Sequence, residues 1–351
     1  MARLLRFTFL FVLFTGAISA QTGTLDAALQ GLVQEAGAKY VAPVITGFGT
    51  NLNSGWVHRA VQAKTFGFDL EVGVVAMGTM FKDENKLFSV SAPFIFSASQ
   101  ANTMANQIAP SASASQKAQI SAAIQAKTFT ATVSGPTIVG AKADYVKSSV
   151  VASSIVVNGT TYNIPATVYQ TSANGVLDGM KALPMAAPQL TFGTIYGTTL
   201  SLRYLPSVKI NDDLGEFKYM GWGLQHNIAQ WIPIPIPVEL SAAFFTQKMD
   251  VGSFFSTTAT TYGLYASKKF GWGALSLTPY AGFALESSSV DVSYTYLSPT
   301  GAKLPIKFSL DGENKSRLTV GASLKLLLFN INADYNVATY NSFSAGFSFF
   351  F

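Results

Sequence analysis

The feature that most constrains this chain is a period-two alternation of large apolar residues with small or polar ones, from residue 66 to the C-terminus. In residues 66–74 every even position is large and apolar, and the odd positions are glycine or acidic. The same pattern recurs in residues 190–204, 238–244, 275–286, 317–328, 331–337 and 343–351. Because successive side chains of a strand point to opposite faces, each segment predicts a strand with one apolar face.

The charged residues indicate what the other face is. Eight charges fall within these segments, all on the polar phase: Asp69, Glu71, Arg203, Glu239, Glu286, Arg317, Lys325 and Asp334. The rest of that phase is mostly Gly, Ser, Thr and Ala. A soluble sandwich also alternates, but its outer face is rich in Lys and Glu. Small residues on one face suit the inside of a closed barrel, and large ones on the other suit lipid.

The alternation therefore predicts which side chains face outward and which face inward. We expect the apolar set to contact lipid: Phe68, Leu70, Leu202, Leu240, Leu324 and Phe347. We expect the charged set to face the lumen, where Asp69, Arg203, Glu239, Lys325 and Asp334 are the test positions. These lumen charges form either a selectivity ring or a structural salt-bridge network.

Composition supports a membrane barrel. Apolar residues make up 49% of the chain and charged residues 12%, against roughly 25% charged in a typical soluble domain. After residue 20, however, no apolar run approaches the ~18 residues that a membrane helix needs. We predict an all-β fold, a closed antiparallel transmembrane β-barrel of about 12 strands, with 10–14 allowed.

The N-terminus has the features of an export signal. Arg3 and Arg6 precede an apolar stretch, and small residues around Ala20 suit cleavage, so we assign 1–20 as a cleaved signal peptide. A retained membrane anchor is the alternative, but the stretch is short for a span. Removal leaves 21 basic against 18 acidic residues, too small an excess to predict nucleic-acid binding. The chain has no Cys, which excludes disulfides, thiolate metal sites and Cys nucleophiles.

Residues 21–62 precede the first predicted strand and are expected to form a plug in the lumen. Thr24 is positioned to cap a helix that ends at Gly37, and 47–56 is rich in Gly and Asn, which favours a loop. The residues expected to form the plug are Leu25, Leu29, Leu32, Trp56, His58 and Arg59. The barrel would then occupy 63–351.

Residues 98–189 interrupt the alternation. Residues 97–125 predict one or two helices, and Asn158-Gly159 predicts a hairpin turn. Three interpretations of residues 98–189 fit the sequence: an elaborated loop, an inserted subdomain or one further strand pair. Elsewhere the connections alternate between tight ones, at 268–271 and 329–330, and longer ones, at 206–215 and 290–315. Tight turns belong on the periplasmic side, where the aromatic girdle would include Trp231, Phe270, Trp272 and Phe329.

The sequence carries few of the motifs that indicate an enzyme. HExxH, P-loop and GxSxG patterns are absent, and the two histidines are His58 and His226. His226 fits either a hydrolase pair with a Ser or an interfacial residue, and His58 with Arg59 fits either a ligand contact or a loop anchor. The loop acids Asp212, Asp213, Glu216, Asp311 and Glu313 match no full Ca²⁺ motif. We predict no catalytic residues, no metal and no cofactor.

Several segments resemble an uncharacterised family of Gram-negative outer-membrane β-barrel proteins. They are residues Gly47–Trp56, Phe66–Leu70, Pro188–Pro206, Ile228–Pro233, Glu286–Tyr294 and Ala333–Gly346. The layout is also similar, more distantly, to the long-chain fatty-acid outer-membrane transporter family, with a signal peptide, a lumenal N-terminal segment, a barrel and a terminal aromatic residue. The row Phe347, Phe349 and Phe351 looks like the C-terminal signal that the barrel-insertion machinery reads. These resemblances imply an outer-membrane location.

Three functions remain open. The first is a passive channel or transporter for small molecules, with a small hydrophobic ligand as partner besides outer-membrane lipid and the insertion machinery. The second is a non-transporting structural or surface-adhesion barrel whose working surface is 98–189. The third is an outer-membrane hydrolase. An open lumen favours the first, a lumen filled by side chains the second, and a Ser beside a His the third.

Overall fold

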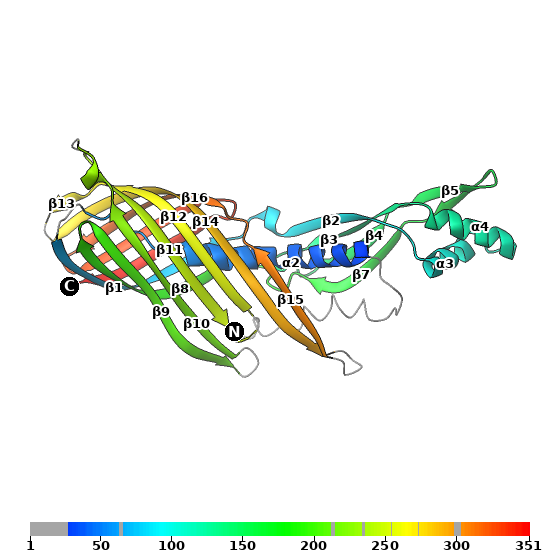
Figure 1. Ribbon diagram of the computed structural model, residues 1–351, viewed down its shortest axis with the longest axis horizontal. Coiled ribbons are helices and arrows are strands. Elements are labelled where there is room, and N and C mark those ends of the chain that lie inside the picture. The colour runs from blue at the N-terminus through cyan, green and yellow to red at the C-terminus, as the bar shows by residue number, and fades with distance from the viewer. Residues whose placement is uncertain are drawn as a thin grey trace. The chain divides into compact units, whose positions relative to one another are not determined.

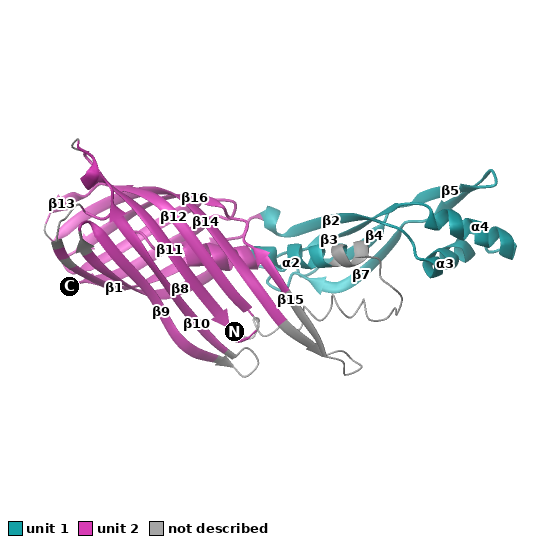
Figure 2. Ribbon diagram, viewed as in Figure 1, with its two compact units in different colours: residues 1–43, 83–179 teal, residues 44–82, 180–351 magenta. Residues whose placement is uncertain are grey.

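The computed structural model describes residues 27–62, 66–211, 215–233, 236–253, 255–272, 274–297 and 303–351. The chain divides into two compact units, coloured separately in Figure 2. Unit 1 comprises residues 1–43 and 83–179, and unit 2 comprises residues 44–82 and 180–351. None of the described helices is long and apolar enough to cross a membrane.

Unit 2 is a closed antiparallel barrel of ten strands, seen as the ring of tilted arrows in Figure 1. In ring order the strands are β1 (Phe66–Met80), β8 (Ala182–Ile195), β9 (Thr198–Asn211), β10 (Gly215–Asn227), β11 (Glu239–Val251), β12 (Phe255–Ser267), β14 (Leu275–Leu297), β16 (Ser316–Leu326), β17 (Phe329–Val337) and β18 (Ser342–Phe350). Two further strands, β13 (Phe270–Trp272) and β15 (Lys303–Asp311), pair with β14 outside the ring. The predicted barrel is confirmed at the lower end of its strand range.

Pairing of the first strand, β1, with the last, β18, closes the ring. The register runs from Glu71 opposite Phe350 to Thr79 opposite Ser342, and β18 pairs on its other edge with β17. Closure leaves no strand edge of the ring unpaired, which is the condition for a sheet to sit in lipid.

The two faces of the barrel differ as the alternation predicts. On the outer face Val74, Leu264 and Val320 are 53%, 59% and 58% exposed, whereas the lumen residue Arg203 is 0% exposed. Phe343, Phe347 and Phe349 of β18 are exposed, and Ser342, Ser344 and Ser348 between them are buried. An outer surface this apolar is stable against lipid rather than water. Phe68 is the one test position whose side chain lies outside the described part.

The two ends of the barrel have different connections. The end that holds Phe351, called the Phe351 end below, has two-residue turns at 196–197 and 327–328. Trp231, Phe270, Trp272 and Phe329 are exposed at this end. At the opposite end, called the Met80 end, β14 and β15 extend beyond the ring pairings. There too the chain leaves β1 at Met80 and returns at Ala182.

Two predicted connections are wrong in position. The tight turn expected at 329–330 lies at Leu327-Leu328, where Leu327 takes a left-handed φ of 57°. The loop expected at 206–215 is largely strand, because β9 continues to Asn211. Asp212 and Asp213 lie outside the described residues. Both errors arise because strand pairing extends as far as two neighbours can exchange hydrogen bonds, which sequence polarity alone does not show.

Unit 1 contains a four-stranded sheet of order β2-β3-β4-β7. Its strands are β2 (Leu87–Phe94), β3 (Phe129–Pro136), β4 (Tyr145–Val150) and β7 (Thr167–Asn174), and η2 (Asp83–Asn85) precedes them. The helices α3 (Ala98–Ile108) and α4 (Ala114–Gln125) begin with capping boxes at Ser97 and Ser113. The strands β5 (Ser153–Val157) and β6 (Thr160–Ile164) form the expected hairpin, with Asn158 and Gly159 at φ 50° and 78°.

Helix α2 (Ala27–Asn53) contributes its first part to unit 1 and its last ten residues to unit 2. In unit 1 the Tyr40 hydroxyl donates to the Asn174 carbonyl at 2.7 Å, and burial raises the pKa of Tyr40. The expected helix end at Gly37 and the expected loop at 47–53 are therefore wrong. Residues 44–53 are buried except Phe48, and a buried backbone favours a helix because it satisfies its own hydrogen bonds even through Gly and Asn.

Candidate functional site

The last ten residues of α2 occupy the inside of the barrel. Every one of residues 44–53 except Phe48 is buried, and the magenta part of α2 in Figure 2 lies within the ring of strands. Leu52 packs in a cluster with Val75, Met77, Tyr219 and Met249 from the surrounding wall. A helix surrounded on all sides fills the lumen, so this segment is a plug.

Two glycines allow the plug to lie against the wall. A Cβ built on Gly49 would lie 2.0 Å from Ser288 Oγ, and one on Gly47 would lie 2.9 Å from Leu183 Cδ2. No side chain fits at the first position without movement of the wall. The glycines that suggested a loop in the sequence therefore serve close helix-to-strand packing.

The plug helix ends in the middle of the barrel, and the wall supplies the donors for its last carbonyl groups. The four final carbonyls of a helix have no partner within it and carry partial negative charge. The last turn of α2 has no basic residue of its own. Arg317 Nη2 of β16 donates to the Asn53 carbonyl, and Arg203 Nη1 of β9 donates to the Ser54 carbonyl at 3.0 Å. We call these two arginines the arginine clamp.

Side chains near the helix end satisfy the neighbouring carbonyls. Ser54 Oγ donates to the Thr50 carbonyl at 2.7 Å, and Trp56 Nε1 donates to the Leu52 carbonyl at 2.9 Å. Gly55 follows with φ 69°, the left-handed conformation that often terminates a helix. The helix end therefore needs no water.

The clamp arginines are themselves held in place. Arg317 pairs with Glu286 at 3.3 Å, with both side chains at most 3% exposed. Arg203 donates through Nε to Gln189 Oε1 at 2.9 Å, and its guanidinium lies 4.0 Å from the centre of the Trp56 ring. Two guanidinium groups in a closed interior are costly unless they are paired, and here the plug carbonyls provide part of that pairing.

Beyond the clamp the chain is irregular, with bends at 54–56 and 58–59, and amide and hydroxyl side chains of the wall bind its backbone. Gln225 Nε2 donates to the Arg59 carbonyl at 2.9 Å, and Asn227 Nδ2 donates to the Val61 carbonyl. Ser267 Oγ accepts a hydrogen bond from the Ala60 backbone N–H at 3.0 Å. The wall therefore holds residues 44–61 along their whole length by hydrogen bonds as well as by packing.

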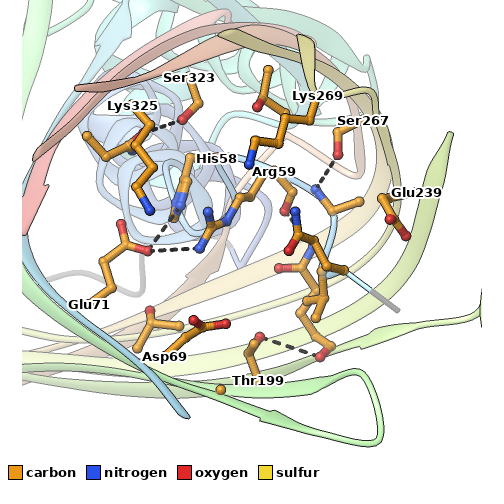
Figure 3. A pocket seen from close by; sticks show the side chains of 18 of the residues that line it. His58, Arg59, Asp69, Glu71, Thr199, Glu239, Ser267, Lys269, Ser323 and Lys325 are labelled. Atoms are coloured by element: carbon orange, nitrogen blue, oxygen red, sulfur yellow. Dashed lines mark hydrogen bonds and ion pairs between the residues drawn. The ribbon is translucent and has the colours of Figure 1, made fainter. Parts of the chain in front are cut away.

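A cavity of about 440 Å³ opens beyond the plug at the Phe351 end; we call it the vestibule. Figure 3 shows His58 and Arg59, which follow the plug helix and are counted with the plug from here on, projecting into the vestibule opposite side chains from several strands. Apart from Trp56, a few aliphatic residues and Phe350, the lining is polar, with hydroxyls from Thr191, Thr199, Ser201, Ser267, Ser276, Thr278 and Ser323. The lining suits a polar solute rather than the small hydrophobic ligand expected from the sequence.

One carboxylate of the vestibule, Glu71, contacts His58 and Arg59 as well as a serine of the wall. Glu71 of β1 lies 3.2 Å from His58 Nε2 and 3.7 Å from Arg59 Nη2, and Ser348 Oγ donates to it. The Arg59 guanidinium also lies 4.6 Å from the centre of the Phe350 ring. These contacts fix the orientation of His58 and Arg59.

The structure places all eight predicted lumen charges inside the barrel. Asp69, Glu71, Glu239 and Lys325 line the vestibule. Arg203, Glu286, Arg317 and Asp334 are at most 7% exposed around the clamp, where Asp334 accepts Tyr280 Oη at 3.0 Å. The charges form two groups at different depths rather than one ring. In the deeper group Arg317 and Glu286 form an ion pair, and Arg203 and Asp334 form hydrogen bonds.

The predicted plug residues separate into two sets. Trp56, His58 and Arg59 lie inside the barrel. Leu32 is buried but belongs to unit 1, so its assignment to the lumen plug is wrong. Leu25 lies outside the described residues, as does the side chain of Leu29. The error follows from ending the helix at Gly37, which placed its N-terminal apolar face in the barrel.

The described residues offer no support for a hydrolase pair. His226 Nε2 accepts the Trp231 indole N–H at 2.8 Å, and its Nδ1 lies 2.9 Å from Thr198 Oγ1. No serine hydroxyl within the described ranges is hydrogen-bonded to either histidine. In the same part of the chain, no group of three or more His, Asp or Glu could hold a metal ion. Glu216, one of the loop acids considered above for Ca²⁺, accepts a hydrogen bond from the Ser207 hydroxyl.

Sequence reasoning missed the amides that bind the plug. Gln189, Gln225, Asn227 and Gln247 stand on the inward phase of their strands among small residues. A long amide among Gly, Ser and Thr reaches further into the lumen than its neighbours, so this pattern was an available signal. Lys269 was also missed as a vestibule residue, because it was assigned to a turn.

Comparison with known proteins gives a family for the chain. The model of a family of unknown function (DUF6588) matches residues 1–351. The chain belongs to this family. No relative was found among curated proteins. The expected membership of an uncharacterised barrel family is confirmed.

Solved outer-membrane barrels resemble the chain only weakly. The β domain of the Bordetella autotransporter BrkA is 9% identical with a TM-score of 0.30, covering 81% of this chain and 99% of that one. LpxR from Salmonella typhimurium is 9% identical with a TM-score of 0.30, covering 81% and 100%. The outer membrane protease OmpT from Escherichia coli is 8% identical with a TM-score of 0.28, covering 83% and 100%. Likeness at this level carries no inference about activity.

Proposed function

We propose that this protein is a plugged outer-membrane barrel that anchors unit 1 at the cell surface of a Gram-negative bacterium. The single observation that carries the proposal is the arginine clamp, which fixes the plug helix across the lumen. Withdrawal of the helix end would leave two buried guanidinium groups without the Asn53 and Ser54 carbonyls that they bind, and buried charges without partners are costly. The closed lumen favours the non-transporting alternative over a passive channel.

Chain topology supports display of unit 1. At the Phe351 end two connections are two-residue turns and one, 228–238, is longer, whereas the Met80 end carries the β14–β15 extension and the 83–179 insertion, by far the longest connection of the barrel. In outer-membrane barrels the short turns face the periplasm and the long connections face outward. By this rule the chain leaves the barrel for unit 1 on the outer side of the membrane.

Epitope tags test this orientation. A tag between Asn158 and Gly159, in the β5–β6 turn, is expected to bind antibody on intact cells. The matched control is the same tag between Leu327 and Leu328, in the turn at the Phe351 end, which should bind antibody only after permeabilisation. The opposite labelling pattern would refute surface display.

Conductance tests the closed lumen separately. The intact protein in planar bilayers should give no steady ion current, and deletion of residues 22–60 should produce one, because it removes the plug. A large steady current from the intact protein would instead support the passive-channel alternative. The same current before and after deletion would show that residues 44–60 do not close the lumen.

We further propose that Phe351 takes part in recognition by the barrel-insertion machinery. Phe351 is 69% exposed and follows Phe347 and Phe349 on the outer face. Deletion of Phe351 should lower the yield of heat-modifiable protein in the membrane without reducing its export. Ser348→Ala, on the lumen face of the same strand, should leave that yield unchanged, and the reverse result would contradict the proposal.

A further inference from the structure

The vestibule gathers positive charge from three separate parts of the chain. Arg59 comes from the plug, Lys269 from the segment between β12 and β13, and Lys325 from β16. Figure 3 shows these three side chains directed into the same space, with His58 between them. Lys268 also lines the cavity. Like charges that converge repel one another unless an anion is nearby.

The carboxylates of the vestibule do not pair with the two central lysines. Within the described ranges, no carboxylate oxygen lies within 4.0 Å of Lys269 Nζ or Lys325 Nζ. Glu71 is engaged by His58, Arg59 and Ser348. Glu239 accepts Asn227 Nδ2 at 2.6 Å, and Asp69 lies on the opposite side of the cavity in Figure 3.

Two of the three cationic groups, Arg59 and Lys325, are held in position. Phe350 provides one ring for two cations, with Arg59 Cζ and Lys325 Nζ each 4.6 Å from its centre. Cation–π contacts of this kind stabilise the charged form and restrict its rotamers. A binding site whose groups are already oriented loses less conformational entropy when a ligand enters.

Hydroxyl groups flank the cations. The Ser276 and Thr278 hydroxyls of β14 line the cavity and form no hydrogen bond with any described residue. Ser323 and Ser267 stand on the neighbouring strands. Small hydroxyls bind both the oxygens of an anion and the hydroxyls of a sugar.

We propose that the vestibule binds a small hydroxylated anion, with its phosphate or carboxylate group between Arg59, Lys269 and Lys325. A volume of about 440 Å³ accommodates a solute of monosaccharide size, within the range of small-molecule sites. Given the orientation proposed above, the ligand enters from the periplasm. This site is separate from the clamp, so its occupation does not require an open lumen.

Calorimetric titration of the full-length protein, folded in detergent at low salt, tests the proposal. The probes are glucose 6-phosphate, gluconate, inorganic phosphate and glucose. We expect at least one hydroxylated anion to bind about tenfold or more tightly than glucose, since a charge-assisted hydrogen bond is worth about one factor of ten. Binding should weaken as NaCl is added, because salt screens exposed charges. Whichever of glucose 6-phosphate and gluconate binds more tightly identifies the anionic group.

The decisive variant is Lys269→Gln with Lys325→Gln, which should weaken binding of that anion by about a hundredfold. Its matched control is Lys218→Gln with Lys248→Gln, which removes the same charge near Asp250, outside the vestibule, and should bind as the native protein does. A heat-dependent gel shift establishes that each variant is folded. The proposal is overturned if no anion binds to the native protein, if glucose binds equally well, or if the vestibule variant binds unchanged.

Discussion

The clamp and the vestibule share the inward face of the same ten strands, yet they treat charge differently. Around the clamp, Arg203 and Arg317 are buried and bind the backbone of the plug, and Glu286 pairs with Arg317. In the vestibule, Lys269 and Lys325 line a cavity, and no carboxylate oxygen of the described residues lies within 4.0 Å of either Nζ. The polar groups inside this barrel therefore fall into two sets, one that binds the chain's own backbone and one that lines a cavity open to a solute.

The largest expected effect comes from breaking the clamp. Arg317→Met leaves Glu286 buried without its partner and the Asn53 carbonyl without a donor. Loss of one member of a buried ion pair costs about 3–5 kcal/mol of unfolding free energy. Urea titration in detergent, followed by the gel shift of the folded barrel, measures this loss.

The combination Arg317→Met with Glu286→Leu provides the control, because it removes both charges. It should recover part of the loss, since no charge is then left buried alone. Equal stability of Arg317→Met and the native protein would show that the clamp does not hold the plug.

A smaller effect is expected from crowding the plug against the wall. Gly49→Leu places a side chain where Ser288 Oγ is only 2.0 Å from the new Cβ, so the helix or the strand must move. Overpacking of this kind costs roughly 1–3 kcal/mol, measurable by the same urea titration.

The control is Gly37→Ala, in the same helix, where a Cβ meets no atom within 4 Å. It should leave stability unchanged or raise it by about 0.5–1 kcal/mol, because Ala is the better helix former. If both variants lose stability equally, close packing at Gly49 is not the cause.

The smallest expected effect is in the vestibule, and it sharpens the contrast with the clamp. Lys269→Gln should change the unfolding free energy by no more than about 0.5 kcal/mol, because Lys269 is exposed. Lys325→Gln should cost about 0.5–1 kcal/mol, because the half-buried Lys325 loses its cation–π contact with Phe350. Urea titration in the absence of anions measures this. A loss comparable with that of Arg317→Met would mean that the vestibule lysines are structural.

The sequence predicted the barrel more completely than it predicted the plug. Alternation along a strand is a local property, so the inward position of Arg203 and the outward position of Phe347 could be read directly. The plug depends on contacts between distant positions, such as Gly49 with Ser288 and Arg317 with Asn53. Local propensity predicted a loop at 47–53, and burial in the lumen overrode that propensity.

The site was predicted in part for the same reason. All eight lumen charges could be named from their phase, but phase does not give depth along the barrel. The division into clamp and vestibule depends on where α2 ends, at Asn53. Gly55 is a helix stop signal there, but Gly37, Gly47 and Gly49 offer the same signal earlier in the segment, so the sequence did not single out Asn53. Lys269 stands in a connection rather than a strand, so its direction into the cavity followed from no periodicity.

The central claim, that the chain closes its own lumen, is tested most directly by a cross-link between plug and wall. The chain has no Cys, so Gly47→Cys with Leu183→Cys introduces the only two thiols. A Cβ on Gly47 lies 3.5 Å from Leu183 Cβ, a separation that a disulfide spans. Mild oxidation of outer membranes should join residues 47 and 183 in most of the molecules, as measured by mass spectrometry of the linked peptides. Two thiols that stay free and react with an alkylating reagent after oxidation would contradict the plugged barrel.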